Sequence, residues 1–265
     1  MLKFVLLSIV FLAQLQSKEY RLEYGFEVGQ KLKYDFSGSH KARFITYDNI
    51  QTAEEKLIGF YEDEVMEITS DVQAKILRKF RIASRQHNGD FKDLNDLASK
   101  NLKYIYYLDP QKGKVKVLDS STFDPKDLME MVVSFPQKTV AVNDTWAKTY
   151  TYNLSNRSAK IEVDGKYKLV AVRGNIARVE GKFQAKIPMD SKTEYLGKLN
   201  FEVVLFFNMR KGLIEKGSFR KILRYESRSK VAKAFLKESR AAGKETRLGY
   251  TLKMHQDFQR VKDDF

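Results

Sequence analysis

The sequence predicts a mainly β protein: a strongly curved antiparallel sheet or incomplete barrel, built from two similar β meanders, with two short helices. Three observations lead to this prediction. Apolar and polar residues alternate over most of the chain, and residues 199–207 place Leu, Phe, Val, Leu and Phe on one side. Short turns rich in Gly, Asn and Asp separate these runs. Similar stretches also recur in the same order in the two halves of the chain.

The composition is that of a folded protein. The chain has 265 residues, of which 43% are hydrophobic and 12% aromatic. Such a chain can bury a sizeable core, as one large β domain or as two ordinary ones. Only 4 prolines are present, and no low-complexity segment occurs, so we expect no long disordered linker.

Residues 1–17 have the pattern of a signal peptide. Lys3 precedes an apolar run over residues 4–13, which is too short to span a bilayer as a helix. We expect cleavage to leave a mature chain that begins near Lys18. The alternative is a retained N-terminal anchor helix. Cleavage implies an exported protein that is periplasmic or extracellular and soluble after the signal is removed.

The chain contains no cysteine. This composition excludes disulfide bonds, thiolate metal sites and cysteine nucleophiles. An exported chain of this kind must hold its fold by core packing, which fits a bacterial periplasm.

Three pairs of stretches indicate an internal duplication. They are residues 28–36 and 142–152, residues 67–77 and 170–180, and residues 106–115 and 205–214. Each pair shares a turn followed or preceded by alternating apolar positions. The duplication predicts that Leu32 superposes on Trp146 and Gly113 on Gly212. Because turns and alternation recur in all β meanders, chance similarity is the alternative. We divide the mature chain into a first β half with helical insertions, 18–137, and a second β half with basic C-terminal strands, 138–265.

Two segments have helical spacing of apolar residues. Residues 88–101 follow this spacing behind Asp90 as a possible cap, and residues 125–135 follow it behind Asp124. Residues 229–240 fit either a strand or a helix. We interpret them as a strand, although Val231, Phe235 and Leu236 would share one side of a helix.

The stretches "YRLEYGFEVGQKLKYDF", "FPQKTVAVNDTW" and "FFNMRKGLIEKG" carry a resemblance to known proteins. They resemble a family of uncharacterised bacterial exported proteins and lipoproteins with phrases such as G-x-x-L-x-Y and P-x-K-x-V-x-x-x-D-x-W. Unlike many of these, the present chain lacks a lipobox cysteine. The resemblance implies an exported β-rich fold and no known reaction, so it assigns no functional residue.

No arrangement of residues points to catalysis. The 3 histidines are far apart, and no metal-binding, phosphate-binding or nucleophile motif is present. We therefore expect no metal, no cofactor and no enzymatic activity. The acidic stretch 62–67 is interpreted as a solvated strand edge.

The net charge of +14 is concentrated towards the C-terminus. A field of this sign attracts polyanions and anionic membrane surfaces. The candidate polyanion-binding residues are Arg220, Arg224, Arg228, Lys230, Lys233 and Lys237. Nucleic acid is disfavoured as a partner because the protein is expected to be exported. The alternative is a solvating coat without a ligand.

Two functions follow from these observations. The first is a non-enzymatic binding protein that holds a lipid or other amphipathic ligand in a concavity of the sheet, since 14 Tyr and 18 Phe fall largely on strands. Residues 125–135 would then act as a lid. The second is a structural or interaction protein that docks on anionic envelope polymers, or on the membrane surface, through its basic face.

Overall fold

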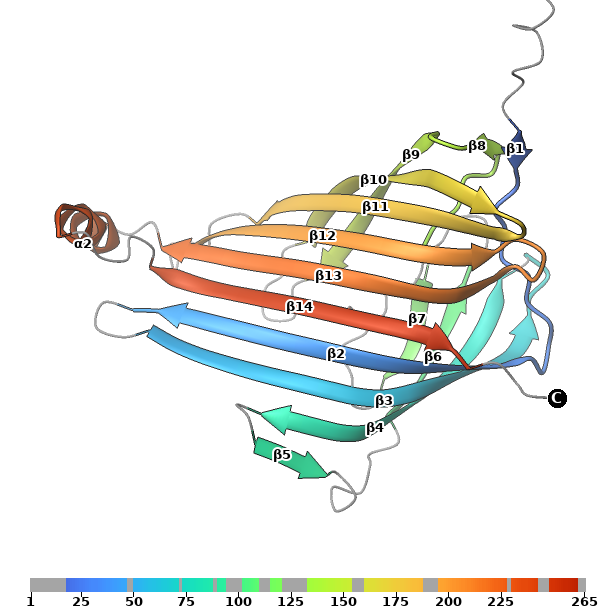
Figure 1. Cartoon of the computed structure of the whole chain (residues 1–265), viewed down its shortest axis with the longest axis horizontal. Coiled ribbons are helices and arrows are strands. Elements are labelled where there is room, and N and C mark those ends of the chain that lie inside the picture. The colour runs from blue at the N-terminus through green and yellow to red at the C-terminus, as the bar shows by residue number, and fades with distance from the viewer. Residues whose placement is uncertain are drawn as a thin grey trace, which may run out of the picture.

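A computed structural model of the chain describes residues 18–46, 50–71, 73–87, 90–93, 102–109, 115–120, 133–153, 160–187, 195–227, 230–242 and 248–261. The described part is mainly β, with antiparallel pairing throughout and one helix (Figure 1). The elements are β1 (Glu19–Tyr20), β2 (Lys31–Ile45), β3 (Ile50–Ile68), β4 (Ala74–His87), β5 (Asp90–Asp93), β6 (Leu102–Leu108), β7 (Val115–Ser120), β8 (Val140–Ala141), β9 (Thr145–Asn153), β10 (Lys160–Arg173), β11 (Ile176–Ile187), β12 (Tyr195–Asn208), β13 (Leu213–Ser227), α2 (Lys230–Ala241) and β14 (Gly249–Arg260).

One large sheet of 12 strands organises the molecule. Its order is β7-β6-β4-β3-β2-β14-β13-β12-β11-β10-β9, with β5 beside β4, while β1 and β8 form a separate pair. Since β7 and β9 are its two ends, the sheet is not closed, and it is not strongly curled. The predicted antiparallel β class is therefore confirmed, and the strong curvature is not shown.

The chain traces the sheet as two meanders. Strands β2, β3, β4, β6 and β7 follow one another as neighbours, and strands β9 to β14 do the same. The pairing of β14 with β2 joins the two meanders in the middle of the sheet. The middle is thus formed by strands that lie far apart in the sequence.

Strict alternation of side chains explains the two faces of the sheet. On β11 the buried residues are Ala177, Val179, Gly181, Phe183, Ala185 and Ile187, and the exposed residues between them include Arg178, Lys182, Gln184 and Lys186. Successive residues of a strand point to opposite faces, so one face collects the apolar residues and the other the charges.

A continuous row of aromatic rings crosses the apolar face. Neighbouring ring centroids lie between 4.8 and 6.0 Å apart, with one ring from each of nine adjacent strands: Trp146, Tyr167, Phe183, Phe201, Phe219, Phe258, Tyr34, Tyr61 and Phe80. We call this the aromatic row, and the face that carries it the aromatic face. Each such pair adds about 0.5–1.5 kcal/mol beyond the area that it buries. The row therefore ties both meanders into one core.

A segment without regular structure covers part of the aromatic face. Val133 and Phe135 are buried, and the ring of Phe135 lies 4.4 Å from that of Phe207. Tyr24 Oη donates a hydrogen bond to the Val133 carbonyl at 3.0 Å, and Trp146 Nε1 donates one to the Ser134 carbonyl at 2.8 Å. These bonds fix the segment against β9 and against the irregular stretch that precedes β2.

Three predictions of local structure need correction or lie outside the described residues. The helix expected over 88–101 is wrong at its start, because Asp90–Asp93 forms strand β5 and pairs with β4. The helix expected over 125–135 does not extend to residues 133–135, and most of its length lies outside the described residues. The rest of the first segment, 94–101, also lies outside them.

The strand interpretation of 229–240 is also wrong, because Lys230–Ala241 is helix α2. The inward residues of α2 recur with helical spacing: Ala232 and Ser239 are buried, and Phe235 and Leu236 are half-buried. This i, i+3, i+4, i+7 pattern gives a helix one apolar stripe, whereas a strand would alternate.

The turn before β2 has a specific hydrogen-bond pattern. Gly29 adopts a φ of 81°, its N–H donates to the Val65 carbonyl at 2.8 Å, and the Val65 N–H donates to the Gln30 carbonyl at 2.9 Å. A β-bulge follows on β3, between Val65 and Glu67. The turn is thereby fastened to the neighbouring strand.

The turn before β9 has the same pattern. Asn143 adopts a φ of 80°, its N–H donates to the Leu169 carbonyl at 2.7 Å, and the Leu169 N–H donates to the Asp144 carbonyl at 3.1 Å. A β-bulge follows on β10, between Leu169 and Ala171. Glycine and asparagine are the residues that enter this left-handed region most readily.

Candidate anion-binding face

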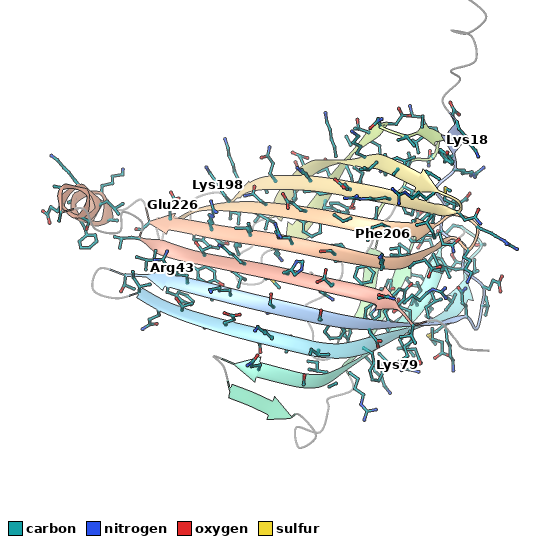
Figure 2. All side chains as sticks on the ribbon, viewed as in Figure 1. Lys18, Arg43, Lys79, Lys198, Phe206 and Glu226 are labelled. Atoms are coloured by element: carbon teal, nitrogen blue, oxygen red, sulfur yellow. The ribbon has the colours of Figure 1, made fainter. Side chains whose placement is uncertain are left out.

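The face opposite the aromatic row is charged, and we call it the polar face. Figure 2 shows side chains on both faces of the long strands, with Lys198 of β12 among those labelled. The basic residues of the polar face on β10 to β14 are Lys166, Lys168, Lys182, Lys186, Lys198, Lys216, Arg178, Arg220, Arg224 and Lys253. Alternation with the buried apolar residues places these side chains on one side of the sheet.

Three cations on neighbouring strands stand directly opposite one another. Lys186 of β11 is paired in register with Lys198 of β12, and Lys198 is paired with Arg224 of β13. We call these three residues the distal row. None of them forms an ion pair within the described residues. Like charges directly opposite across strands are destabilising, so the row costs stability in the absence of an anion.

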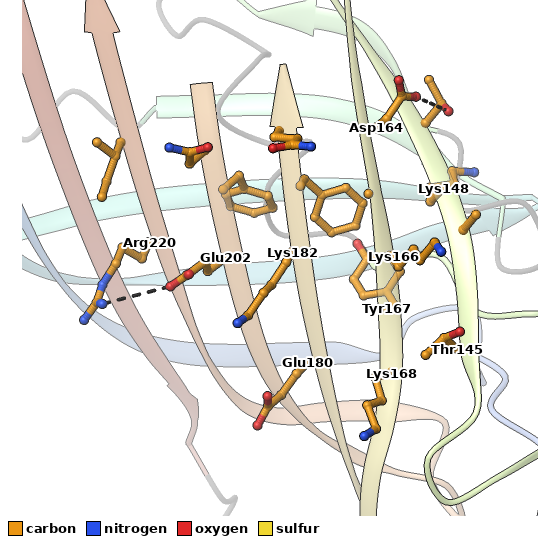
Figure 3. Close-up of a pocket in the computed structure, with 18 residues that line it drawn as sticks. Thr145, Lys148, Asp164, Lys166, Tyr167, Lys168, Glu180, Lys182, Glu202 and Arg220 are labelled. Atoms are coloured by element: carbon orange, nitrogen blue, oxygen red, sulfur yellow. Dashed lines mark hydrogen bonds and ion pairs between the residues drawn. The ribbon is translucent and has the colours of Figure 1, made fainter. Parts of the chain in front are cut away.

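A second basic group lies in a groove of the polar face. The groove has a volume of about 950 Å³ and crosses strands β9 to β13 (Figure 3). Lys166 of β10 is paired in register with Lys182 of β11, and Lys168 follows two residues along β10. We call these three the groove lysines. All three are exposed. In the register, Lys168 stands opposite Glu180 and Lys182 stands opposite Glu202.

The acidic residues of the groove have partners of their own. Glu202 lies 4.0 Å from Arg220 and Glu180 lies 2.5 Å from Arg178. Asp164 accepts a hydrogen bond from the Thr149 hydroxyl at 2.7 Å. In Figure 3, Arg220, Glu202, Lys182 and Lys166 stand side by side on successive strands. The positive charge of the groove lysines is therefore compensated only in part, because Glu202 stands between Lys182 and Arg220.

The six predicted polyanion-binding residues do not lie in one row. Arg220 and Arg224 lie on the polar face of β13, four residues apart, next to the groove and in the distal row respectively. Lys233 and Lys237 are exposed on helix α2, which lies beyond the end of the strands (Figure 1). Arg228 and the side chain of Lys230 lie outside what the structure describes.

Sequence reasoning missed the lysines that complete the face. Lys166, Lys182, Lys186 and Lys198 belong to strands of the second meander, upstream of the strongly basic C-terminal part. Their alternation with buried residues was a readable signal for one common face. Which of them would stand opposite one another depended on strand register, which alternation alone does not determine.

A buried ion pair on the aromatic face was also missed. Arg78 makes two hydrogen bonds of 2.5 Å to the carboxylate of Asp63, and its guanidinium lies 4.2 Å from the centre of the Tyr61 ring. A cavity of about 40 Å³ lies beside the pair. Burial raises the pKa of the Tyr61 hydroxyl well above its usual value, although Arg78 acts in the opposite direction.

The interpretation of 62–67 as a solvated edge is therefore wrong for Asp63. Asp63 falls between Tyr61 and Val65 on β3, at a position that the alternation places inward, and only 5% of its surface is exposed. Glu62 and Glu64 point to the other face, where both lie near Lys79, at 3.7 and 3.2 Å.

The described residues offer neither a metal site nor a membrane-spanning helix. No cluster of three or more His, Asp or Glu side chains that could hold a metal ion occurs among the residues placed by the structure. In the same part of the chain, no helix has the length and apolar character needed to cross a bilayer.

The fold and the polar face define an antiparallel β protein with one open sheet and a cationic surface. Residues 120–209 match DUF6263, a family of unknown function. The matched segment contains β8 to β12, including the groove lysines and two members of the distal row. A comparison with curated proteins gives no match.

Proposed function

We propose that the protein is a binding protein, without enzymatic activity, that docks on an anionic envelope component through its polar face. The observation that carries this proposal is the distal row, in which Lys186, Lys198 and Arg224 stand in register without an acidic partner among the described residues. An anionic ligand bound across the row would attract all three cations and so offset their mutual repulsion. The net charge of +14 adds a long-range field that steers such a ligand to the protein.

The test is salt-dependent retention on immobilised heparin and on anionic vesicles. Exposed charges are screened beyond about 10 Å at 0.1 M salt, so retention should fall steeply between low and physiological ionic strength. The variant Lys198→Glu/Arg224→Glu/Arg220→Glu should lose retention. It should remain folded, because Lys198 and Arg220 are exposed and Arg224 is half-buried, and charge changes at the surface seldom alter stability by more than about 0.5 kcal/mol.

A matched control separates a site from overall charge. The variant Lys31→Glu/Lys138→Glu/Arg210→Glu makes the same charge change at exposed positions outside the distal row and the groove. It should keep most of the retention. Equal loss in both variants would mean that only net charge matters, and an unretained wild type at low salt would overturn the proposal.

A second candidate function has its own observation. Away from the aromatic row, the aromatic face is only partly covered: Leu57, Leu223 and Tyr225 are half-buried, and Phe44 is 43% exposed. This surface would suit a lipid or other amphipathic ligand. Neutral Nile red should then bind with enhanced fluorescence, and Leu223→Glu should abolish the signal. An unchanged signal in that variant would remove the candidate.

We further propose that the two meanders are repeats of one unit. Leu32 pairs with Asp63 two residues before the bulge at Val65, and Trp146 pairs with Tyr167 two residues before the bulge at Leu169. On the next strands the matching pairs are Ala74 with Leu108 and Ala177 with Phe207. These registers favour the expected superposition of Leu32 on Trp146. The expected match of Gly113 with Gly212 has no outcome here, because Gly113 lies outside the described residues.

Export remains part of the proposal. The apolar run over residues 4–13 behind Lys3 favours a cleaved leader. Export would place the polar face among the anionic polymers and lipids of a bacterial envelope.

A further inference from the structure

The register of Lys166 and Lys182 is unfavourable unless an anion is present. Lys166 and Lys182 are direct cross-strand partners on the polar face, and Lys168 lies on the same face of β10. Side chains at such positions have Cβ atoms about 5 Å apart, and like charges there are destabilising. Glu180 stands opposite Lys168 and Glu202 stands opposite Lys182, and these two glutamates also lie near Arg178 and Arg220. The row formed by Lys166, Lys182, Glu202 and Arg220 therefore holds three cations and one carboxylate.

We propose that the groove binds a single chain of a linear anionic polysaccharide, which runs across the strands from β10 to β13. This inference rests on the proposed function and specifies its ligand. Three cations lie along this direction. Lys166 is paired with Lys182, Glu202 stands between Lys182 and Arg220, and Arg220 is paired with His255 of β14. Strands lie about 4.8 Å apart, so an extended chain meets a new side chain at each strand.

Neutral polar groups in the groove favour a sugar over a simple polyphosphate. Gln184 and Asn200 are exposed cross-strand partners in the next row, and both line the groove. Thr145 lines it beside Lys168. Amide and hydroxyl groups donate and accept hydrogen bonds, so they match the hydroxyl groups of a sugar ring. Ammonium groups interleaved with such donors suit a chain that carries both hydroxyl and anionic groups.

The shape of the site favours a chain over a membrane surface. The groove lysines line a groove of about 950 Å³ in the sheet face, whereas a bilayer presents its headgroups in a plane. The distal row lies four residues further along the strands, about 13 Å away. A planar surface cannot follow the groove, while a flexible chain can enter it.

The experiment uses the full chain and fluorescent heparin oligosaccharides of increasing length at low salt. Affinity should rise with length until the chain spans the groove and then level off. Lys166→Gln/Lys182→Gln should weaken binding by about tenfold or more, because two charge contacts are lost. The same loss should reduce the dependence of binding on salt concentration. The control Lys31→Gln/Lys138→Gln removes the same charge at exposed sites outside the groove and should bind like wild type.

Additional measurements separate this inference from the proposed function. Gln184→Ala/Asn200→Ala should weaken the oligosaccharide and leave polyphosphate of equal charge unaffected. The inference is overturned if vesicles containing phosphatidylglycerol bind and oligosaccharides do not, or if Lys166→Gln/Lys182→Gln binds oligosaccharides like wild type. The proposed function survives both results. If wild type binds none of the three probes at low salt, the inference and the proposed function both fail.

Discussion

Arg78 and Asp63 face each other across β3 and β4, with Nε and Nη2 each 2.5 Å from a carboxylate oxygen. Exposure is 4% for Arg78 and 5% for Asp63, so this ion pair lies in the core. Arg78 Nη2 also donates to the Tyr106 hydroxyl at 3.2 Å, and the Tyr61 ring lies against the guanidinium. The pair therefore links three neighbouring strands, β3, β4 and β6.

Removing one member of this pair should destabilise the protein strongly. Arg78→Met leaves Asp63 buried without its cation, and loss of one buried partner costs about 3–5 kcal/mol. Urea unfolding measures the loss. The double variant Asp63→Leu/Arg78→Met should recover most of it, because two apolar residues of similar size need no compensating charge. A double variant as unstable as the single one would contradict this account.

The turn at Gly29 should accept asparagine and reject a β-branched residue. Gly29 has a φ of 81° with no atom within 4 Å of an added Cβ, and Asn143 occupies the matching turn with a φ of 80°. Gly29→Asn should therefore change stability little. Gly29→Val should cost about 1–2 kcal/mol from backbone strain alone. Equal stability of both variants in thermal unfolding would show that the turn adopts another conformation.

Phe219 should contribute much more to stability than Phe44. Phe219 is 3% exposed and stacks between Phe201 and Phe258 in the aromatic row, whereas Phe44 is 43% exposed. Phe219→Ala should cost about 3–5 kcal/mol through the cavity that it leaves. Phe44→Ala is the matched control and should cost far less. Similar losses for the two variants would mean that the row does not carry the core.

Stability should fall as the pH rises from about 10 to about 12, partly through Tyr150. Burial raises the pKa of Tyr150 to about 12, and its hydrogen bond with Tyr167 opposes the shift. In this range the unfolded chain releases the phenol proton while the folded chain keeps it, so rising pH favours unfolding. A shift of this size corresponds to about 3 kcal/mol once both forms are ionised.

Tyr150→Phe isolates this contribution, because phenylalanine has no proton to release. Urea unfolding of wild type and variant should show that the difference in stability between them changes over the same pH range. A difference independent of pH would mean that Tyr150 ionises as easily in the folded protein as in the unfolded chain.

Expression in a bacterial host with an intact export pathway should yield a chain that begins near Lys18. The apolar run over residues 4–13 carries this expectation. Intact mass of the exported protein measures it. A mass that corresponds to all 265 residues would contradict cleavage.

The sequence by itself determined the β class, the alternating faces and the turns. The alternation in 199–207 is a local property, and the turn residues Gly29 and Asn143 are dictated by a local backbone conformation. The pattern of β strands could therefore be read without the fold. Helix α2 was missed because its short apolar stripe competes with the alternation of the strands around it.

Only the tertiary structure decided which residues stand together. Nothing local in the sequence says that Lys186, Lys198 and Arg224 share one row, or that Arg78 meets Asp63, because cross-strand partners depend on hairpin lengths and bulges. A shift of register by one residue would move each of these side chains to the opposite face. The charge of the protein was thus visible in the sequence, but its arrangement into a row and a groove was set by strand pairing.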